Sequence, residues 1–440
     1  MSELDPSAPA ATPDPSAIAP PPPALPLAPV AARERIELID VLRGMALFGI
    51  LAANIRGFAG PAATYFMPHL FWPALNDRIA QAFIDTFIQG KFITIFATLF
   101  GVGFGVQTER ALSRGGKFNW TWARRCLVLL AFGLVHGILI WFGDILLVYA
   151  LTGLLLLPFK RRENRTLKIW AIVMYLVPVL LMLGAIAAAQ MGATPPPEKI
   201  PTAAAIEKTR ELFSNGTWLA IEKARANDVV SHNWLYFPFF FWEILGLFLT
   251  GLLLYRRGFF TPSLESIPRY RRLMAWTLPL GIAGNAAIVA MIWIFKPSPM
   301  PTTPLAGVIG FLHTFAVPCL SLGYICLVVV LFHSAKWHGV VHRFAAIGRT
   351  AFSNYLLQSV LGTLIFYSYG LGFFGQVGPA LLLPMTIVIF AIQVAISRWW
   401  LTQYRFGPME WVWRRLTYGG PLPMRRELPA AVPEEAAAAS

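Results

Sequence analysis

Long apolar stretches alternate with short polar connections along most of this chain. There are ten such stretches, and each carries few charged residues. A helix needs about 20 consecutive apolar residues to cross a bilayer core, within a range of about 17–25. Most stretches meet this length, whereas the fourth is short and the second and eighth are long enough to tilt or protrude. The spans that we predict are 40–58, 81–107, 123–141, 144–159, 168–190, 234–255, 274–295, 305–332, 345–370 and 378–400.

This pattern predicts an all-α fold, a polytopic bundle of about ten transmembrane helices. Segments 1–32 and 421–440 are rich in Pro and Ala and are predicted to be flexible tails. The first tail has no basic stretch followed by an apolar one, so we do not expect a cleaved signal peptide. Two five-helix membrane halves, 33–190 and 234–420, are joined by an extracytoplasmic loop, 191–233. Apolar residues at helical spacing in that loop indicate amphipathic helices that serve either as a connector or as a lid over a substrate.

The charge distribution supports a membrane location and sets an orientation. Only 13% of the 440 residues are charged and 56% are hydrophobic, which excludes a disordered chain and argues against a soluble enzyme. The net charge is +14, which in a soluble protein would suggest a nucleic-acid partner. With the N-terminus inside, however, 27 basic residues fall on the inner side and 8 on the outer side. We therefore predict cytoplasmic termini, the lipid bilayer as partner, and no nucleic acid.

Ionisable residues inside apolar stretches are costly and are therefore functional candidates. Lys91, Glu243 and His313 each fall within a predicted span. Lys91 and Glu243 at similar depth could form an ion pair, either as a structural brace or as part of a proton relay. His313 is either a packing residue or a relay member. The three cysteines have no zinc-ligand spacing, so no metal site is predicted.

The third and fourth spans contain the best candidate for chemistry. His136 lies about one turn before a short hairpin, and Asp144 opens the next span. A carboxylate near a histidine can orient the imidazole and raise its basicity, which suits a general base. Asp144 could equally cap the following helix, and the two roles are compatible.

Several polar residues elsewhere are further candidates for a functional role. Arg43, near the cytoplasmic end of the first span, could bind a phosphate or act as a charge anchor. Asn54 follows eleven residues later, about 16 Å along a helix. His69 lies among aromatic residues in the first outer loop. Asn354 and Gln358, with Tyr355 and Ser359, form a polar stripe that could line a cavity or bond neighbouring helices. The glycines at 101, 103 and 105 indicate close helix packing, since no strand precedes them.

Five segments in order resemble the YeiB-like family of bacterial inner-membrane proteins, known as domain of unknown function 418. They are Ile39-Asp40-Val41-Leu42-Arg43-Gly44, Lys91-Phe92 with Leu99-Phe100-Gly101, His136-Gly137 with Gly143-Asp144-Ile145-Leu146, Asn354-Tyr355-Leu356-Leu357-Gln358, and Gly407-Pro408-Met409-Glu410-Trp411-Val412-Trp413-Arg414. The resemblance runs from about residue 36 to 420. It implies a multi-pass protein of the bacterial inner membrane.

That family is distantly similar to transmembrane acyltransferases, which move acyl groups onto extracytoplasmic sugars. Their first helix carries an Arg-Gly pair and, about eleven residues after the Arg, a histidine. Arg43-Gly44 matches the pair, but Asn54 occupies the histidine position. An amide cannot act as the base, so the resemblance implies that His69 or His136 would supply it.

Three hypotheses for function follow. In the first, a membrane acyltransferase holds a cytoplasmic donor, with acyl-CoA as the candidate, at Arg43, and His136 oriented by Asp144 deprotonates a small-molecule acceptor. In the second, a proton-coupled small-molecule transporter relays protons through Lys91, Glu243, His136 and Asp144. In the third, the chain is a non-catalytic membrane scaffold. The sequence leaves the substrate and the oligomeric state open.

Overall fold

The described part of the chain is helical throughout, as the sequence predicts. A computed structural model describes residues 35–65, 67–113, 118–192, 202–295 and 303–426. The predicted tail 1–32 and residues 427–440 of the second tail lie outside the described residues. Among the described ones there is no strand, and a single isolated bridge joins Tyr404 to Arg425. The all-α prediction is confirmed.

Seven helical stretches of the described chain are long and apolar enough to cross a membrane. They are Glu37–Ala59 (α1), Leu75–Ser113 (α3, Leu75–Phe87, and α4, Lys91–Ser113), Phe118–Leu139 (α5), Asn164–Gln190 (α7), Leu264–Phe295 (containing α10, Ile267–Phe295), Pro304–Phe332 (α11) and Pro379–Gln403 (α15). The predicted spans 144–159 and 345–370 contain α6 (Leu146–Leu154) and α14 (Ala351–Phe366), and the predicted span 234–255 lies within α9 (Trp218–Arg256). The structure is that of a membrane-embedded helical bundle that contacts lipid. The count of ten spans and the side of the termini stay predictions.

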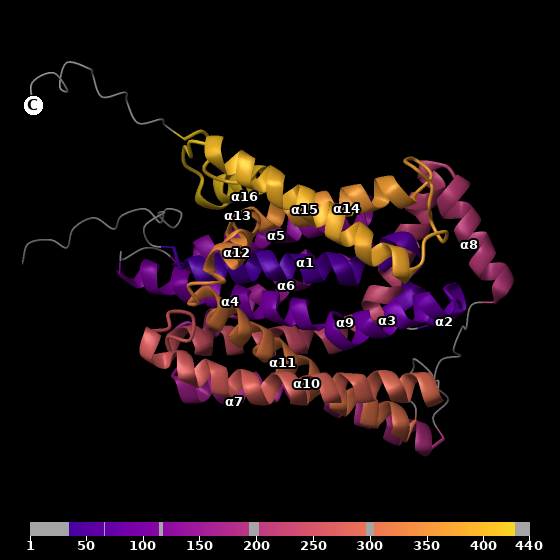
Figure 1. Cartoon of the computed structure of the whole chain (residues 1–440), viewed down its shortest axis with the longest axis horizontal. Coiled ribbons are helices and arrows are strands. Elements are labelled where there is room, and N and C mark those ends of the chain that lie inside the picture. The colour runs from indigo at the N-terminus through magenta and orange to yellow at the C-terminus, as the bar shows by residue number, and fades with distance from the viewer. Residues whose placement is uncertain (1–34, 66, 114–117, 193–201, 296–302, 427–440) are drawn as a thin grey trace, which may run out of the picture.

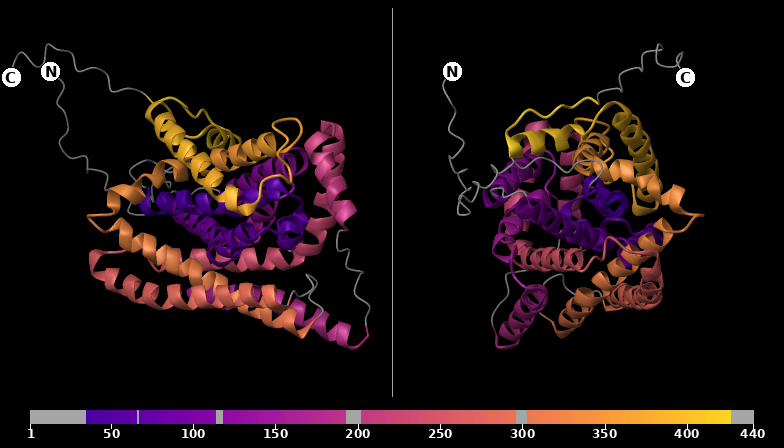
Figure 2. Two further views of the ribbon diagram at one scale, coloured as in Figure 1. Left: turned by 45° about the vertical axis from the view of Figure 1, so that its right-hand side comes forward. Right: turned by 90° about the vertical axis from the view of Figure 1, so that its left-hand side faces the viewer.

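The long helices run side by side along the longest axis of the molecule, and α1 lies in the middle of them (Figures 1 and 2). Of the apolar window in α1, 72% is buried, against 22% in α7. Large apolar side chains on the outlying helices are exposed, as expected where the surroundings are hydrocarbon; Leu180 and Trp276 are examples. The central position of α1 brings its polar residues into the interior of the bundle.

Short helices cover the two ends of the bundle. At the end where α1 begins lie α12 (His338–His342), α13 (Phe344–Arg349) and α16 (Pro408–Tyr418), and at the other end lie α2 (Pro68–Phe71) and α8 (Ala203–Asn215) (Figure 1). Helix α8 crosses the direction of the long helices (Figure 2). Phe213 of α8 stacks on Phe374, with ring centroids 4.6 Å apart. The expected helices in 191–233 are thus α8 and the first part of α9, while residues 193–201 lie outside the described residues.

The second predicted span, 81–107, is divided by a turn. The backbone amides of Ile88 and Gln89 both donate to the Ile84 carbonyl, which ends α3, and Gly90 has a φ of +83°. A left-handed residue is tolerated there because glycine has no Cβ. Lys91 is consequently the first residue of α4 rather than a residue inside a continuous helix.

Glycines allow α4 and α9 to approach closely. A Cβ on Gly101 would lie 1.9 Å from the Phe248 carbonyl oxygen, and a Cβ on Gly251 would lie 1.9 Å from that of Thr98. Each helix therefore presents a glycine to the backbone of the other, in the manner of small-residue packing in membranes. This agrees with the prediction of close helix packing at Gly101, whereas Gly103 lines an interior cavity.

Replacing Gly101 with Ala is expected to destabilise the bundle, because the methyl group would force the two backbones apart. Overpacking costs about 1–3 kcal/mol, and more where backbone must move. Thermal unfolding in detergent measures the change. The control is Gly184→Ala in α7, where nothing lies within 4 Å of the added Cβ. An equal melting temperature for the two variants would contradict the packing role of Gly101.

Candidate functional site

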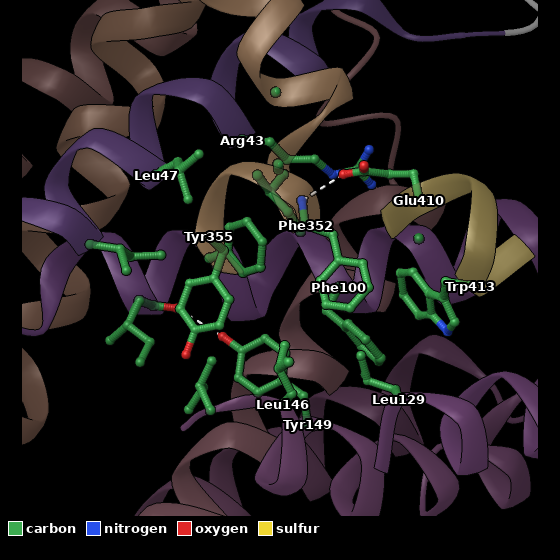
Figure 3. A pocket seen from close by; sticks show the side chains of 18 of the residues that line it. Arg43, Leu47, Phe100, Leu129, Leu146, Tyr149, Phe352, Tyr355, Glu410 and Trp413 are labelled. Atoms are coloured by element: carbon green, nitrogen blue, oxygen red, sulfur yellow. Dashed lines mark hydrogen bonds between the residues drawn. The ribbon is translucent and has the colours of Figure 1, made fainter. Parts of the chain in front are cut away.

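One cavity of about 510 Å³ runs through the interior beside α1. The same cavity is lined by Arg43 near the start of α1 and by Asn54 near its end. Helices α4, α5, α6, α14 and α16 supply most of the other wall residues, and α9, α13 and the hairpin 141–145 supply further ones. Its middle section is apolar and aromatic, and Figure 3 shows the rings of Phe100, Tyr149 and Tyr355 around it. The cavity therefore joins two polar ends through an apolar passage.

Five arginines line the end of the cavity where α1 begins: Arg35, Arg43, Arg125, Arg349 and Arg414. Arg43 pairs with Asp40 at 3.3 Å. Burial, with smaller contributions from neighbouring arginines, lowers the pKa of Arg414 to about 10. Burial, with Arg43 and Arg426 adding to its effect, also lowers the pKa of Arg35. Crowded cations of this kind are stabilised by a bound anion.

The other acidic residue that lines this end, Glu410, accepts hydrogen bonds from backbone amides. Its Oε1 accepts hydrogen bonds from the Phe352 amide at 2.6 Å and the Ser353 amide at 3.2 Å, and its Oε2 accepts one from the Ser353 hydroxyl. These bonds satisfy the free amides at the start of α14. Burial nevertheless raises the pKa of Glu410 above the usual range for a carboxyl group. Glu410 thus fixes α14 against α16, and the positive charge at the cavity wall remains in excess.

The opposite end of the cavity contains the histidine and carboxylate that the sequence singles out. His136 Nδ1 lies 2.8 Å from Asp144 Oδ1, and His136 Nε2 lies 2.9 Å from the Ser359 hydroxyl. The second Asp144 oxygen accepts the Leu147 amide at 2.8 Å. Asp144 therefore both contacts His136 and caps the start of α6, so the two readings of this residue coexist. Asp144 lines the cavity, whereas His136, only 1% exposed, lies behind it.

Aromatic and polar groups close this end. The Trp141 indole nitrogen donates to the Gly57 carbonyl at 3.2 Å, and its ring packs on Phe58. Asn54 and Tyr65 line the cavity nearby. His69 belongs to α2, but its side chain lies outside the described residues. His136 and Asp144 are thus the predicted base candidates that the described contacts bring to this end.

Comparison with known proteins identifies relatives along nearly the whole chain. Residues 254–420 match the model of a "Protein of unknown function (DUF418)". The chain is 33% identical to "Uncharacterized protein YxaH" of Bacillus subtilis (strain 168) over 412 residues, which are 89% of this chain and 96% of that protein. It is 32% identical to "Uncharacterized protein YeiB" of Escherichia coli (strain K12), covering 87% of this chain and 96% of that protein.

The chain belongs to the DUF418 family. The predicted resemblance is thereby confirmed, and the molecule is a bacterial membrane protein of an uncharacterised family. Neither relative carries a name that states an activity, so its chemistry has to be argued from the site.

The ion pairs of this DUF418 bundle differ from the predicted pair. Among the described residues Lys91 and Glu243 do not contact each other. The Lys91 ammonium donates to the Asp85 carbonyl at 2.6 Å, and the Glu243 carboxylate lies 3.5 Å from the Tyr175 hydroxyl. The possible Lys91–Glu243 pair does not form, because the turn before α4 directs the lysine back to α3. His313 is exposed on α11.

The polar stripe on α14 divides between two neighbouring helices. The Asn354 side-chain amide donates to the Ser397 hydroxyl at 2.9 Å, and that of Gln358 donates to the side-chain oxygen of Gln393 at 2.9 Å. These bonds attach α14 to α15, the helix-bonding alternative for the stripe. Tyr355 instead lines the cavity, and Ser359 contacts His136 on α5.

Two ion pairs with fully buried arginines were not predicted from the sequence. Arg56 on α1 pairs with Asp85 on α3 at 3.0 Å. Arg225 on α9 pairs with Glu222 and donates to the carbonyls of Leu139, at 3.0 Å, and Ile140 at the end of α5. The sequence places these arginines among solvated outer charges, and no local signal marks them as buried.

Replacing Arg225 with Met is expected to destabilise the protein strongly. The substitution leaves Glu222 and two α5 carbonyls without a cationic donor in a site where Arg225 is 0% exposed. Breaking a buried pair costs about 3–5 kcal/mol. The matched control is Arg210→Met in α8, whose pair with Glu207 has the same spacing but is 49% exposed at the arginine; about 0.5 kcal/mol is expected there. Equal losses in the free energy of unfolding for the two variants would show that Arg225 does not stabilise the end of α5.

Proposed function

We propose that this DUF418 protein transfers an acyl group from a cytoplasmic donor to an extracytoplasmic acceptor. The observation that carries the proposal is the single cavity that joins the arginine-lined end to the end occupied by Asp144. An acyl donor with an anionic head, for which acyl-CoA is the candidate, needs cations at one end and an apolar passage for its arm. A group that accepts a proton is needed where the acyl carbonyl meets the acceptor.

The arginine end suits the donor head. Guanidinium groups bind phosphate oxygens in pairs and keep their charge when partly buried. Few carboxylates are available to neutralise these arginines. Asp40 pairs with Arg43, and Glu410 accepts hydrogen bonds from the α14 backbone. The excess of Lys and Arg in the loops next to this end supports a cytoplasmic placement, and hence an inner-membrane location.

The Asp144 end suits the reaction. An acceptor hydroxyl beside Asp144 would lose its proton to the Asp144 carboxylate, which His136 holds in place, as its oxygen attacks the acyl carbonyl. The carbon–sulfur bond of a thioester donor then breaks, and the proton passes to the departing thiolate. This arrangement removes the need for a histidine at position 54, because the base, Asp144, lies just before α6 rather than on α1.

Product formation tests the proposal. Purified protein in lipid vesicles would be given labelled acyl-CoA and periplasmic extract. We expect labelled product from the wild type, and none from His136→Ala. The control is His342→Ala in α12, an exposed histidine at the other end of the bundle, which should leave product formation unchanged. Label that stays with the donor in every extract would overturn acyl transfer.

A second candidate function is proton-coupled transport. The observation in its favour is the turn between α3 and α4, where Asp85, Arg56 and Lys91 gather next to an interrupted helix. Interrupted helices with ionisable side chains are a common site of ion coupling in transporters. Proton uptake that depends on an added solute, without any labelled product, would select this function. Failure of both assays would leave the scaffold hypothesis.

The orientation behind both functions can be measured directly. A reporter inserted after Asn215, at the end of α8, is expected to be active only on the outer side of the membrane. A fusion at the chain's C-terminus should report the cytoplasm. The reverse result would place the arginine-lined end of the cavity on the outer side of the membrane and would contradict a cytoplasmic donor.

A further inference from the structure

Ser359 completes a chain of three hydrogen-bonded side chains that starts at the cavity wall. Asp144 lines the cavity, His136 lies behind it, and the Ser359 hydroxyl lies 2.9 Å from the far ring nitrogen. Ser359 is 1% exposed and does not line the cavity. The neighbouring polar residues of α14 are occupied with α15, so Ser359 is the residue of that stripe whose hydroxyl meets the imidazole.

The three groups fix the protonation pattern of the imidazole. An ionised carboxylate only accepts hydrogen bonds, so Nδ1 carries the hydrogen that Asp144 accepts. Nε2 is then an acceptor, and the Ser359 hydroxyl donates to it. When the imidazole takes up a second proton, Nε2 becomes a donor, and the hydroxyl must accept instead. A hydroxyl can do both, because its hydrogen rotates.

The alternative acceptor for the rotated hydroxyl is already in place. The Tyr355 carbonyl oxygen, one turn earlier on α14, lies 3.5 Å from the Ser359 oxygen. The Tyr355 ring also lies against the imidazole, with centroids 5.2 Å apart, and forms part of the cavity wall. Both protonation states of His136 can therefore be satisfied without moving a helix.

We propose that Ser359 is a positioning residue that holds His136 in the tautomer whose Nδ1–H bonds to Asp144, and so fixes the carboxylate at the cavity wall. The inference rests on the proposed function for its catalytic consequence, although the tautomer itself can be measured without any activity. Ser359 does not act as a nucleophile in this scheme, because His136 and Asp144 separate its oxygen from the cavity.

Two readouts test the role of Ser359. Ser359→Ala is expected to lower kcat for acyl transfer about 10–100-fold with KM unchanged, since the buried Nε2 atom that holds the imidazole in place is left without a donor. Ser359→Thr, which keeps the hydroxyl, should restore most of kcat. Independently, the ring ¹⁵N resonances of His136, assigned by their loss in His136→Gln, should shift at Nε2 in Ser359→Ala and stay near the wild-type values in Ser359→Thr.

A control variant and three possible outcomes decide whether Ser359 positions His136. Ser397→Ala removes another buried hydroxyl, bonded to Asn354 rather than to histidine, and should leave the His136 resonances unchanged. Unchanged His136 resonances in Ser359→Ala would overturn the positioning role even if the enzyme is active. An acyl adduct on Ser359, seen by peptide mass spectrometry, would overturn it in favour of a nucleophile. Absence of acyl transfer in the wild type would refute the proposed function while the ¹⁵N result still decides the role of Ser359.

Discussion

Asp144→Asn is expected to reduce kcat for acyl transfer by about 10²–10⁴-fold, the range that general base catalysis contributes. The amide keeps the size of the side chain and can still accept the Leu147 amide, so the start of α6 stays capped. It cannot take up the proton of the acceptor hydroxyl as a carboxylate can. Thermal unfolding should therefore change by less than about 1 kcal/mol while activity is lost.

The double variant sharpens this prediction. If Asp144 and His136 act as a unit, combining Asp144→Asn with His136→Ala should cost little more than His136→Ala alone, because groups that act together are not additive. Steady-state kinetics in vesicles gives the comparison. Losses that multiply would show that the two residues act separately, and Asp144 would then be only a helix cap.

Arg414→Gln is the second large effect that we expect. Arg414 lines the cavity at its basic end, and one charged hydrogen bond to a donor phosphate is worth about 1.5–3 kcal/mol, or about 10–150-fold in KM. The adjacent Arg415 is exposed and packs on Trp411 instead of lining the cavity. Arg415→Gln on the same helix therefore serves as a matched control with the same change of net charge.

The salt dependence of donor binding gives an independent measure of the basic end. Binding that depends on several arginines weakens as ionic strength rises, and Arg414→Gln should reduce this dependence while Arg415→Gln should not. Equal KM values for the two variants would contradict an anionic donor head at this end. The cavity would then have to be entered by a neutral ligand.

Hydropathy predicts the helices well, because a helix in hydrocarbon must satisfy its own backbone and present apolar side chains. It predicts α1, α5, α7, α11 and α15 to within a few residues at most ends. It fails at the α3–α4 turn, because hydropathy carries no information about the backbone conformation of Gly90, whose positive φ ends the helix. The sequence therefore could not show that Lys91 turns back to the Asp85 carbonyl.

Residues close in sequence were the ones whose contact could be foreseen. His136 and Asp144 are eight positions apart across a tight hairpin, which leaves few arrangements that separate them. His136 and Ser359 are 223 positions apart. The 3.6-residue period placed Ser359 on a polar stripe of its helix, but which neighbouring helix each member of the stripe meets depends on packing.

The sequence by itself determined that this protein is an all-α membrane bundle with a basic end, and that His136 and Asp144 lie near each other. Only the tertiary structure decided that one cavity links the arginines to Asp144, that Glu410 serves backbone rather than arginine, and that Ser359 meets His136. The reason is physical. Hydropathy and charge act on each segment separately through the solvent, whereas a site between helices exists only after side chains from distant segments have packed together.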